Sequence, residues 1–310
     1  MTPTVALGPG NEFDAIRTLL ARWGDRAVGV GDDAAALDVP RGDALVVSVD
    51  SAVENKHFRR GWLTAREIGY RAVTAALSDL AAMAAKPLGI LIALSVPHGW
   101  RDDLFDLGDG IGDAVIAANT VVRGGNISTA TELSITTTVL GAAYRPLARS
   151  TARAGDLVYL TGTLGAPRAA LRLLEEGKSP GAYRERLAGP VARVREARWL
   201  AERGATACID ISDGLVGDLR HMAAASSVGI TLDAARVPRA RGVDVEEALV
   251  GGEEYELIVT SHVAFDIAAF EQRFGVPLTE IGAVSVMRPG EVRVIGARIA
   301  DTSGHDHFSS

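Results

Sequence analysis

The hydrophobic and polar positions of this chain follow two periods, one typical of strands and one of helices. Short apolar and β-branched runs predict strands over 44–49, 89–96, 133–142, 157–161, 207–211, 229–232 and 257–260. Apolar residues spaced three and four apart predict helices over 12–20 and 64–85. Further helices are expected between the strands over 89–96 and 133–142, after Gly165 as far as residue 174, and from residue 215 onward. A polar, turn-like segment over 145–154 separates two halves, and 178–186 is expected to be a connection.

The stretch 207–215 carries two carboxylates at the junction of a buried strand and a helix. Asp210 lies near the end of the apolar run, and Asp213 precedes Gly214, which permits the turn into the helix. Ser212 or Asp213 could simply cap that helix. Asp210 needs another explanation, because an ionised carboxylate on a buried strand is costly unless it is paired, hydrogen-bonded or bound to a cation.

A third carboxylate lies on the helix predicted over 64–85. Thr64 and Glu67 have the spacing of a capping box, which places the start of the helix. From residue 72 to 85 the helix is almost entirely apolar, so it is expected to be buried. Asp79 falls on the stripe that faces the core. It is either a hydrogen-bonded core residue or a functional group, and we favour the second interpretation.

Further acidic groups and one histidine lie beside glycine turns and strand ends. Asp33 follows Gly29–Val30–Gly31, Asp50 ends the strand over 44–49, and Glu253 follows Gly251–Gly252. Each acidic turn could also be a solvated loop. His57 lies in the loop over 53–60, which comes after the strand over 44–49. A histidine in such a loop is more often a surface or hydrogen-bonded residue than a ligand contact.

If these carboxylates converge, their mutual repulsion must be offset, either by raised pKa values or by bound cations. Oxygen ligands from Asp, with Ser or Asn nearby, suit Mg²⁺, which commonly bridges protein to substrate phosphates. The sequence has no Gly-Lys-Ser/Thr phosphate loop and no kinase-type glycine loop, so the standard nucleotide motifs are absent. The residues alone therefore indicate Mg²⁺-dependent phosphate chemistry, or a metal-stabilised binding protein without turnover.

Length and composition narrow these options. The chain has 310 residues, enough for two domains, and a net charge of −7, which argues against nucleic-acid binding. Cys208 is the single cysteine, so an internal disulfide and a multi-cysteine metal site are excluded. We expect no signal peptide, no membrane-spanning segment and a cytoplasmic location.

Taken together and in order, the motifs resemble those of the thiamine-monophosphate kinase family, within the aminoimidazole ribonucleotide synthetase-like superfamily. The resemblance covers nearly the whole chain. The matching pieces are Gly29–Asp33, Ser48–Ser51 with His57–Phe58, Leu77–Met83, Arg149–Ser150, Gly155–Gly165, Ile209–Leu215, Gly251–Leu257 and Asp306–Phe308.

The resemblance implies an α+β fold in two domains, 1–145 for ATP and metal binding and dimerisation and 146–310 as a C-terminal α+β domain. It implies a homodimer formed by the N-terminal sheet, with several Mg²⁺ ions and ATP. It implies transfer of the γ-phosphoryl group of ATP to thiamine monophosphate. The implied metal ligands are Asp33, Ser48, Asp50, Asp79, Asn126, Asp210 and Asp213; the ATP contacts are Gly125, Asn126, Arg149 and Ser212; the substrate contacts are His57, Glu253 and His305.

Four positions depart from the family pattern. Asn126 replaces a metal-binding Asp, Val49 a Thr, Glu254 an Asp, and His305 an aromatic residue. These departures leave two alternatives open. One is a related ATP-dependent enzyme acting on another small phosphate or amide, and the other is a nucleotide-binding paralogue without catalysis.

Overall fold

The computed structural model describes residues 11–30 and 34–297, and it divides the chain into two compact units. The first unit comprises residues 1–80 and 85–145, and the second comprises residues 81–84 and 146–310. Each unit has its own sheet, and each is considered by itself. The predictions for Asp33 and His305 fall outside the described residues.

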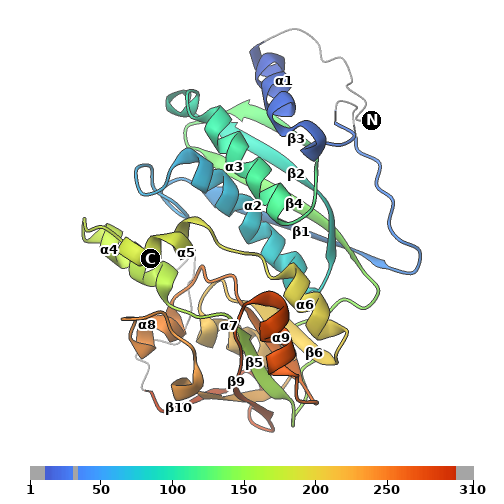
Figure 1. Ribbon diagram of the computed structural model, residues 1–310, viewed down its shortest axis with the longest axis vertical. Coiled ribbons are helices and arrows are strands. Elements are labelled where there is room, and N and C mark those ends of the chain that lie inside the picture. Colours follow the sequence, from blue (N-terminus) through green and yellow to red (C-terminus); the bar gives the residue numbers. More distant parts are fainter. Residues whose placement is uncertain (1–10, 31–33, 298–310) are drawn as a thin grey trace. The chain divides into compact units, whose positions relative to one another are not determined.

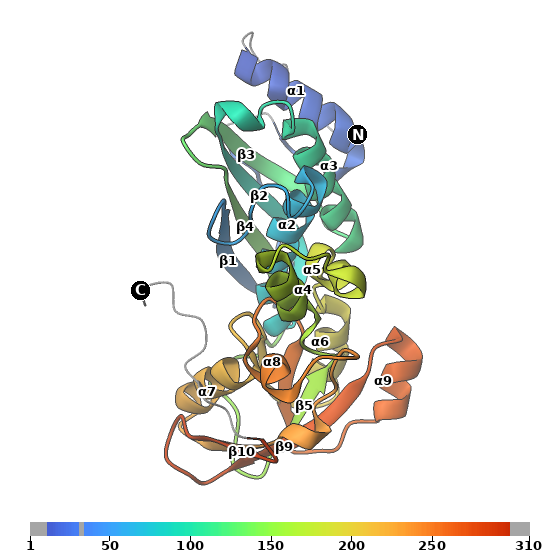
Figure 2. The same cartoon turned by 90° about the vertical axis from the view of Figure 1, so that its left-hand side faces the viewer.

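In the first unit, one face of a four-stranded sheet carries helices (Figures 1 and 2). The strand order is β1-β4-β2-β3, with β3 parallel to β2 and the other neighbours antiparallel. The elements are α1 (Asn11–Trp23), β1 (Ala44–Val53), α2 (Ala65–Ala82), β2 (Lys86–Val96), α3 (Leu104–Ala117), β3 (Val122–Thr129) and β4 (Ser134–Ala143), with 3₁₀ turns at Gly24–Arg26 and His98–Trp100.

The other face of this sheet exposes apolar side chains. Along the edge strand β1, Leu45, Val47 and Val49 alternate with more buried residues and are 50%, 54% and 61% exposed. Ser48 lies between them and points toward α2, as its hydrogen bond to that helix shows. The sheet is therefore covered by helices on one face and open on the face that carries these three residues.

The second unit is built on a six-stranded mixed sheet of order β10-β7-β9-β5-β8-β6. Its strands are β5 (Leu157–Thr161), β6 (Ala205–Asp210), β7 (Gly229–Asp233), β8 (Leu257–Ser261), β9 (Leu278–Ser285) and β10 (Val292–Ile295). Its helices are α4 (Ala166–Glu175), α5 (Arg184–Ala188), α6 (Val194–Ala201), α7 (Leu215–Ala225), α8 (Val245–Val250) and α9 (Ile267–Phe274), with 3₁₀ turns at Gly181–Tyr183 and Ala234–Arg236.

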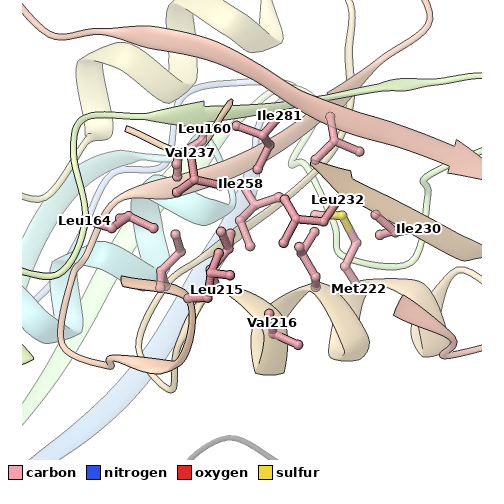
Figure 3. Close-up of a cluster of buried hydrophobic side chains, with 14 of the residues drawn as sticks. Leu160, Leu164, Leu215, Val216, Met222, Ile230, Leu232, Val237, Ile258 and Ile281 are labelled. Carbon is pink, nitrogen blue, oxygen red and sulfur yellow. The ribbon is translucent and has the colours of Figure 1, made fainter. Parts of the chain in front are cut away.

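Helix α7 packs its apolar side on this sheet and fixes the approach of the preceding loop. Leu215 and Met222 are fully buried in one cluster with Ile258 and Leu232 from the strands (Figure 3). Leu219 belongs to the same cluster and is also fully buried. Burial of a leucine or methionine side chain of this kind contributes about 1.5–3 kcal/mol. The helix start is thus anchored at the carboxyl end of β6.

Most predicted elements form, and the differences have a common cause. The strand over 44–49 continues to Val53, so Asp50 lies within β1 rather than after it. The two consecutive glycines at 124–125 favour a turn, but the segment 123–126 pairs with β2 as part of strand β3. Part of the expected connection over 178–186 is helical, at Gly181–Tyr183 and from Arg184. In each case pairing or packing outweighs the local preference of glycine or polar residues.

Within residues 11–30 and 34–297, the structure contains no helix long and apolar enough to cross a membrane. The helices that are most apolar, such as α3, are instead buried within their unit.

Helices α2 and α3 approach so closely that glycine is required at the contact. A β-carbon on Gly110 would lie 1.8 Å from the carbonyl oxygen of Arg66, which is backbone and cannot move aside easily. We expect Gly110→Ala to lower the free energy of unfolding by about 1–3 kcal/mol, measured by urea denaturation. Gly99→Ala is the control, since its nearest neighbour is the flexible Arg60 side chain at 3.5 Å. Equal stability of the two variants would contradict this packing argument.

Candidate metal- and nucleotide-binding residues

Ser48 and Asp79 meet between the sheet and α2 of the first unit. The Ser48 hydroxyl donates to Asp79 Oδ2 at 2.5 Å, and both side chains are half-buried. The capping box that begins α2 forms as predicted, with the Thr64 amide 2.8 Å from Glu67 Oε2 and the Glu67 amide 3.2 Å from Thr64 Oγ1. A strand hydroxyl and a helix carboxylate are therefore held together at a defined place.

Asp50 shares the helix-facing side of β1 with Ser48, because both positions alternate with the exposed apolar residues. It is exposed, and its Oδ1 accepts the Ser51 amide at 2.7 Å. His57 lies in the loop after β1, half-buried, and its Nδ1 accepts the Val53 amide at 3.0 Å. This bond requires Nδ1 to be unprotonated, so Nε2 carries the proton of the neutral ring.

Gly125 and Asn126 lie on the edge strand β3 and are exposed. Asn126 pairs with Ala93, Ala93 pairs with Thr136, and Thr136 pairs with Ser51. Since directly paired residues share a face of a sheet, the Asn126 side chain lies on the open face, opposite Ser48. The structure thus brings Ser48 and Asp79 together but does not bring Asn126 to them within one chain.

In the second unit, Asp210 is the last residue of β6 and is 7% exposed, as the sequence predicted. The capping interpretation of Ser212 and Asp213 is wrong. The N-cap of α7 is Gly214, with φ of 115°, and no side chain caps the helix. A β-carbon on Gly214 would lie 2.6 Å from the carbonyl oxygen of Val250, so this turn requires glycine.

The loop after β6 is bonded along one edge to the segment Gly251–Glu256. Ile211 donates its amide to the Glu256 carbonyl at 2.8 Å and accepts the Tyr255 amide at 2.9 Å. The Ser212 carbonyl accepts the Glu253 amide at 2.8 Å. These bonds continue the β6–β8 pairing and place Glu253 beside the loop that carries Ser212 and Asp213.

Two residues of α7 join this loop and were not predicted from the sequence. Asp218 Oδ2 accepts the amides of Ser212 and Asp213, each at 3.2 Å. Ligand atoms of Asp213, Asp218 and His221 all lie within 4.8 Å of one another. Burial, with the charges of Asp210 and Asp213, raises the pKa of Asp218 to about 8. The signal for Asp218 was an acidic residue among the buried positions of an amphipathic helix, and His221 follows one turn later.

The Gly251–Glu256 segment is not a solvated turn, because Glu254 and Glu256 are completely buried. Glu256 accepts both Arg193 Nε at 2.8 Å and Arg193 Nη2 at 2.6 Å, with Arg186 Nη2 at 2.8 Å. Glu254 Oε1 accepts the Gly165 amide at 2.5 Å, and its Oε2 has no partner within the described structure. The buried Arg193 and the half-buried Arg186 therefore fix the end of the segment that presents Glu253.

Arg149 lies in the irregular segment after the first unit and is exposed. Its carbonyl accepts the Ser226 hydroxyl at 2.8 Å. The donor set of each unit consists of carboxylate, hydroxyl and amide oxygens, with His221 as an added nitrogen. This oxygen-rich chemistry fits Mg²⁺ and the phosphates that it binds.

The two units, each with its own sheet and its own set of oxygen donors, define a two-domain α+β protein of the AIR synthase class. Residues 31–143 match the model of the AIR synthase related protein, N-terminal domain, and residues 153–295 match that of the C-terminal domain. The chain is 33% identical to thiamine-monophosphate kinase from Escherichia coli strain K12, over 94% of this chain and 98% of the relative. The chain belongs to the thiamine-monophosphate kinase family.

Solved structures agree with this assignment. Thiamine-monophosphate kinase from Stenotrophomonas maltophilia K279a superposes with a TM-score of 0.82 at 32% identity, covering 94% of this chain and 97% of that chain. The structure described as AaThiL complexed with AMPPCP and TMP has a TM-score of 0.77 at 29% identity, covering 99% and 100%. The expected resemblance and the expected two-domain α+β fold are confirmed.

The buried Glu254 predicts a specific pH dependence of stability. Burial raises its pKa from 4.5 to about 8. The charges of Glu256 and Glu253 act in the same direction, while the Gly165 hydrogen bond and Arg186 oppose the increase. Between these values the unfolded chain ionises while the native carboxyl stays protonated, so this group's contribution to stability falls as pH rises. The loss is about 1.4 kcal/mol per pH unit.

We therefore expect Glu254→Gln to remove this contribution, so that its stability declines less than that of the wild type between pH 5 and pH 8, the range that the shift spans. Urea denaturation at each pH measures the difference. Glu202→Gln, on the exposed end of α6, is the matched control and should follow the wild type. Parallel curves for wild type and Glu254→Gln would show that Glu254 ionises normally.

Proposed function

We propose that the chain catalyses Mg²⁺-dependent transfer of the γ-phosphoryl group of ATP to thiamine monophosphate, giving thiamine diphosphate and ADP. The observation that carries the proposal is similarity over nearly the full length of thiamine-monophosphate kinases. The oxygen donors of the two units support it, because phosphoryl transfer depends on positioning and charge neutralisation more than on covalent groups. Since ATP is an intracellular substrate, we place the activity in the cytoplasm.

The metal ligands proposed on this basis come from both units. Ser48, Asp50 and Asp79 would act in the first unit, and Asp210 and Asp213 in the second; Asp33 and Asn126 complete the set. Bound Mg²⁺ would neutralise charge on the transferring phosphoryl group. The geometric support is strongest for Ser48 with Asp79, which already share a hydrogen bond, and for Asp210 at the buried end of β6.

Other residues would hold the two substrates. Arg149, Ser212 and Gly125, with Asn126, would contact ATP, while His57, Glu253 and His305 would contact thiamine monophosphate. With Nδ1 bonded to Val53, His57 can donate from Nε2 to a phosphate oxygen. In the reaction an acceptor phosphate oxygen forms a bond to the γ-phosphorus as the bond to the ADP oxygen breaks.

The direct test measures ADP formation from Mg-ATP with and without thiamine monophosphate, together with the mass of the product. We expect ADP to form only when the acceptor is present, with one thiamine diphosphate for each ADP. ADP formed with another small phosphate or amide would favour the related enzyme, and nucleotide binding without turnover would favour the non-catalytic paralogue.

The carboxylates Asp79 and Asp210 should serve ligand binding rather than folding. We expect Asp79→Asn and Asp210→Asn each to abolish Mg²⁺-dependent nucleotide binding, measured by calorimetry with Mg²⁺ and AMPPCP. Stability should be kept or increased, because each change removes a charge from a crowded acidic site. Asp106→Asn, at an exposed position of α3, is the control. Unchanged affinity in both variants would refute the proposed role.

Asn126 offers a test of the metal arrangement. An amide oxygen supplies only a dipole to a cation, so Asn126→Asp should lower the Mg²⁺ concentration that gives half-maximal activity. In the absence of Mg²⁺ the variant should be less stable, because a like charge is added. A magnesium titration of the activity of both proteins measures this concentration. An unchanged concentration would place Asn126 away from the cations, or in a site remodelled for another ligand.

We also propose that residues 1–145 form the ATP- and metal-binding domain and join two copies into a homodimer through the open face of the first sheet. Leu45, Val47 and Val49 leave an apolar surface on edge strand β1 of that sheet. Residues 146–310 would then act as the C-terminal α+β domain.

Light scattering at micromolar concentration should give a mass of twice 32.4 kDa. Val47→Glu should yield a monomer, because dimerisation would bury the new charge without a partner. Val286→Glu, at a 90% exposed residue of the second unit, is the control and should remain dimeric. A monomeric wild type, or a Val47→Glu variant that stays dimeric, would exclude this interface.

A further inference from the structure

The loop Ile211–Asp213 has two bonded edges with different kinds of support. On one edge, the amide of Ile211 and the carbonyls of Ile211 and Ser212 bond to backbone atoms of Glu253–Glu256. On the other edge, the amides of Ser212 and Asp213 point to a single side-chain atom, Asp218 Oδ2. One side chain therefore fixes the direction of both residues.

We propose that Asp218 is a positioning residue that orients Ser212 and Asp213 for nucleotide and metal binding. The inference rests on the proposed function, because that function gives Ser212 and Asp213 their roles. Asp218 acts through two backbone amides and does not itself need to contact a ligand.

The position of Asp218 makes it a rigid anchor. It is 3% exposed in the first turn of α7, and its own amide bonds to the Gly214 carbonyl at 2.9 Å. Helix α7 is in turn held to the sheet by the buried Leu215 and Leu219. Because the helix is fixed on the sheet, its Asp218 carboxylate holds the preceding loop in a fixed position as well.

The loop is closely packed on the edge that faces the segment Gly251–Glu256. Beyond the clash at Gly214, a β-carbon on Gly252 would lie 2.4 Å from the Ser212 carbonyl oxygen, so the opposite segment is in close contact. Loss of the acceptor would leave two amides without their partner, which is unfavourable if they stay buried. The loop can avoid this cost by turning its amides toward water, which would reorient the Asp213 side chain.

The cluster of Asp213, Asp218 and His221 suggests a different role, in which Asp218 itself binds the cation. Its Oδ2 already accepts two amides, which is the reason we assign it to positioning. Substitution by Asn separates the two roles. The amide keeps an oxygen that can accept both N–H groups, but it lacks the charge that a metal ligand supplies.

The experiment compares wild type with Asp218→Leu and Asp218→Asn, and with Asp156→Leu as the control. Asp156 is another buried carboxylate of the second unit; it accepts the Arg153 amide at 2.9 Å and the Thr206 hydroxyl at 2.6 Å. Thr206 lies near the beginning of β6, whereas the loop follows its end. Hydrogen exchange is measured on peptides covering 209–215, and the Kd of AMPPCP is measured with Mg²⁺.

In wild type we expect the Ser212 and Asp213 amides to exchange slowly. Asp218→Leu should speed their exchange by at least about tenfold and raise the Kd by about tenfold or more. Asp218→Asn should keep the Kd within about threefold of wild type, and Asp156→Leu within about twofold, even if its thermal midpoint falls.

Several results would overturn the inference. These are rapid exchange of the two amides in wild type, an unchanged Kd in Asp218→Leu, or an equal loss in Asp156→Leu. A large loss in Asp218→Asn would instead make Asp218 a ligand. If Asp218→Leu does not fold, amide exchange in the wild type and the Kd of Asp218→Asn still test the positioning role. Because exchange and AMPPCP binding need no turnover, failure to phosphorylate thiamine monophosphate would refute the proposed function separately.

Discussion

The architecture of the second unit depends on how it accommodates carboxylates that are costly to bury. Asp210 and Asp218 are both buried, with Asp213 close to Asp218. Backbone hydrogen bonds hold one edge of the intervening loop and the Asp218 side chain holds the other, so these charges cannot simply move apart into water. The raised pKa of Asp218 expresses the resulting cost. A fold that concentrates negative charge in a rigid loop is suited to binding cations that offset it.

The first unit also places a carboxylate beside an apolar core, but its polar groups are less buried than those of the second unit. There a strand hydroxyl and a helix carboxylate are joined by one hydrogen bond, and Asp50 on the same side of β1 is exposed. In both units an apolar scaffold fixes polar groups at strand or helix positions, where packing leaves little freedom. This arrangement is what phosphoryl transfer requires, because its catalysis consists mainly of positioning and charge neutralisation.

Much of this organisation could be predicted from the sequence. The apolar run that ends at Asp210 identified a buried carboxylate, and Thr64 with Glu67 marked the start of α2, because both signals are local. Asp218 was missed because its importance comes from two amides in a preceding loop. The strand character of Arg123–Asn126 was missed because it depends on pairing with β2. The burial of Glu256 likewise depends on Arg186 and Arg193, and that of Glu254 on the Gly165 amide, all far away in the sequence.

In the proposed reaction, the carboxylates hold cations that bridge the protein to nucleotide phosphates. The most direct measurement is the thermal midpoint of the protein with Mg²⁺ alone, with AMPPCP and EDTA, and with Mg²⁺ and AMPPCP together. We expect a large increase of the midpoint only when Mg²⁺ and AMPPCP are both present, because each needs the other in order to bind among the carboxylates. An equal increase with AMPPCP in EDTA would contradict it.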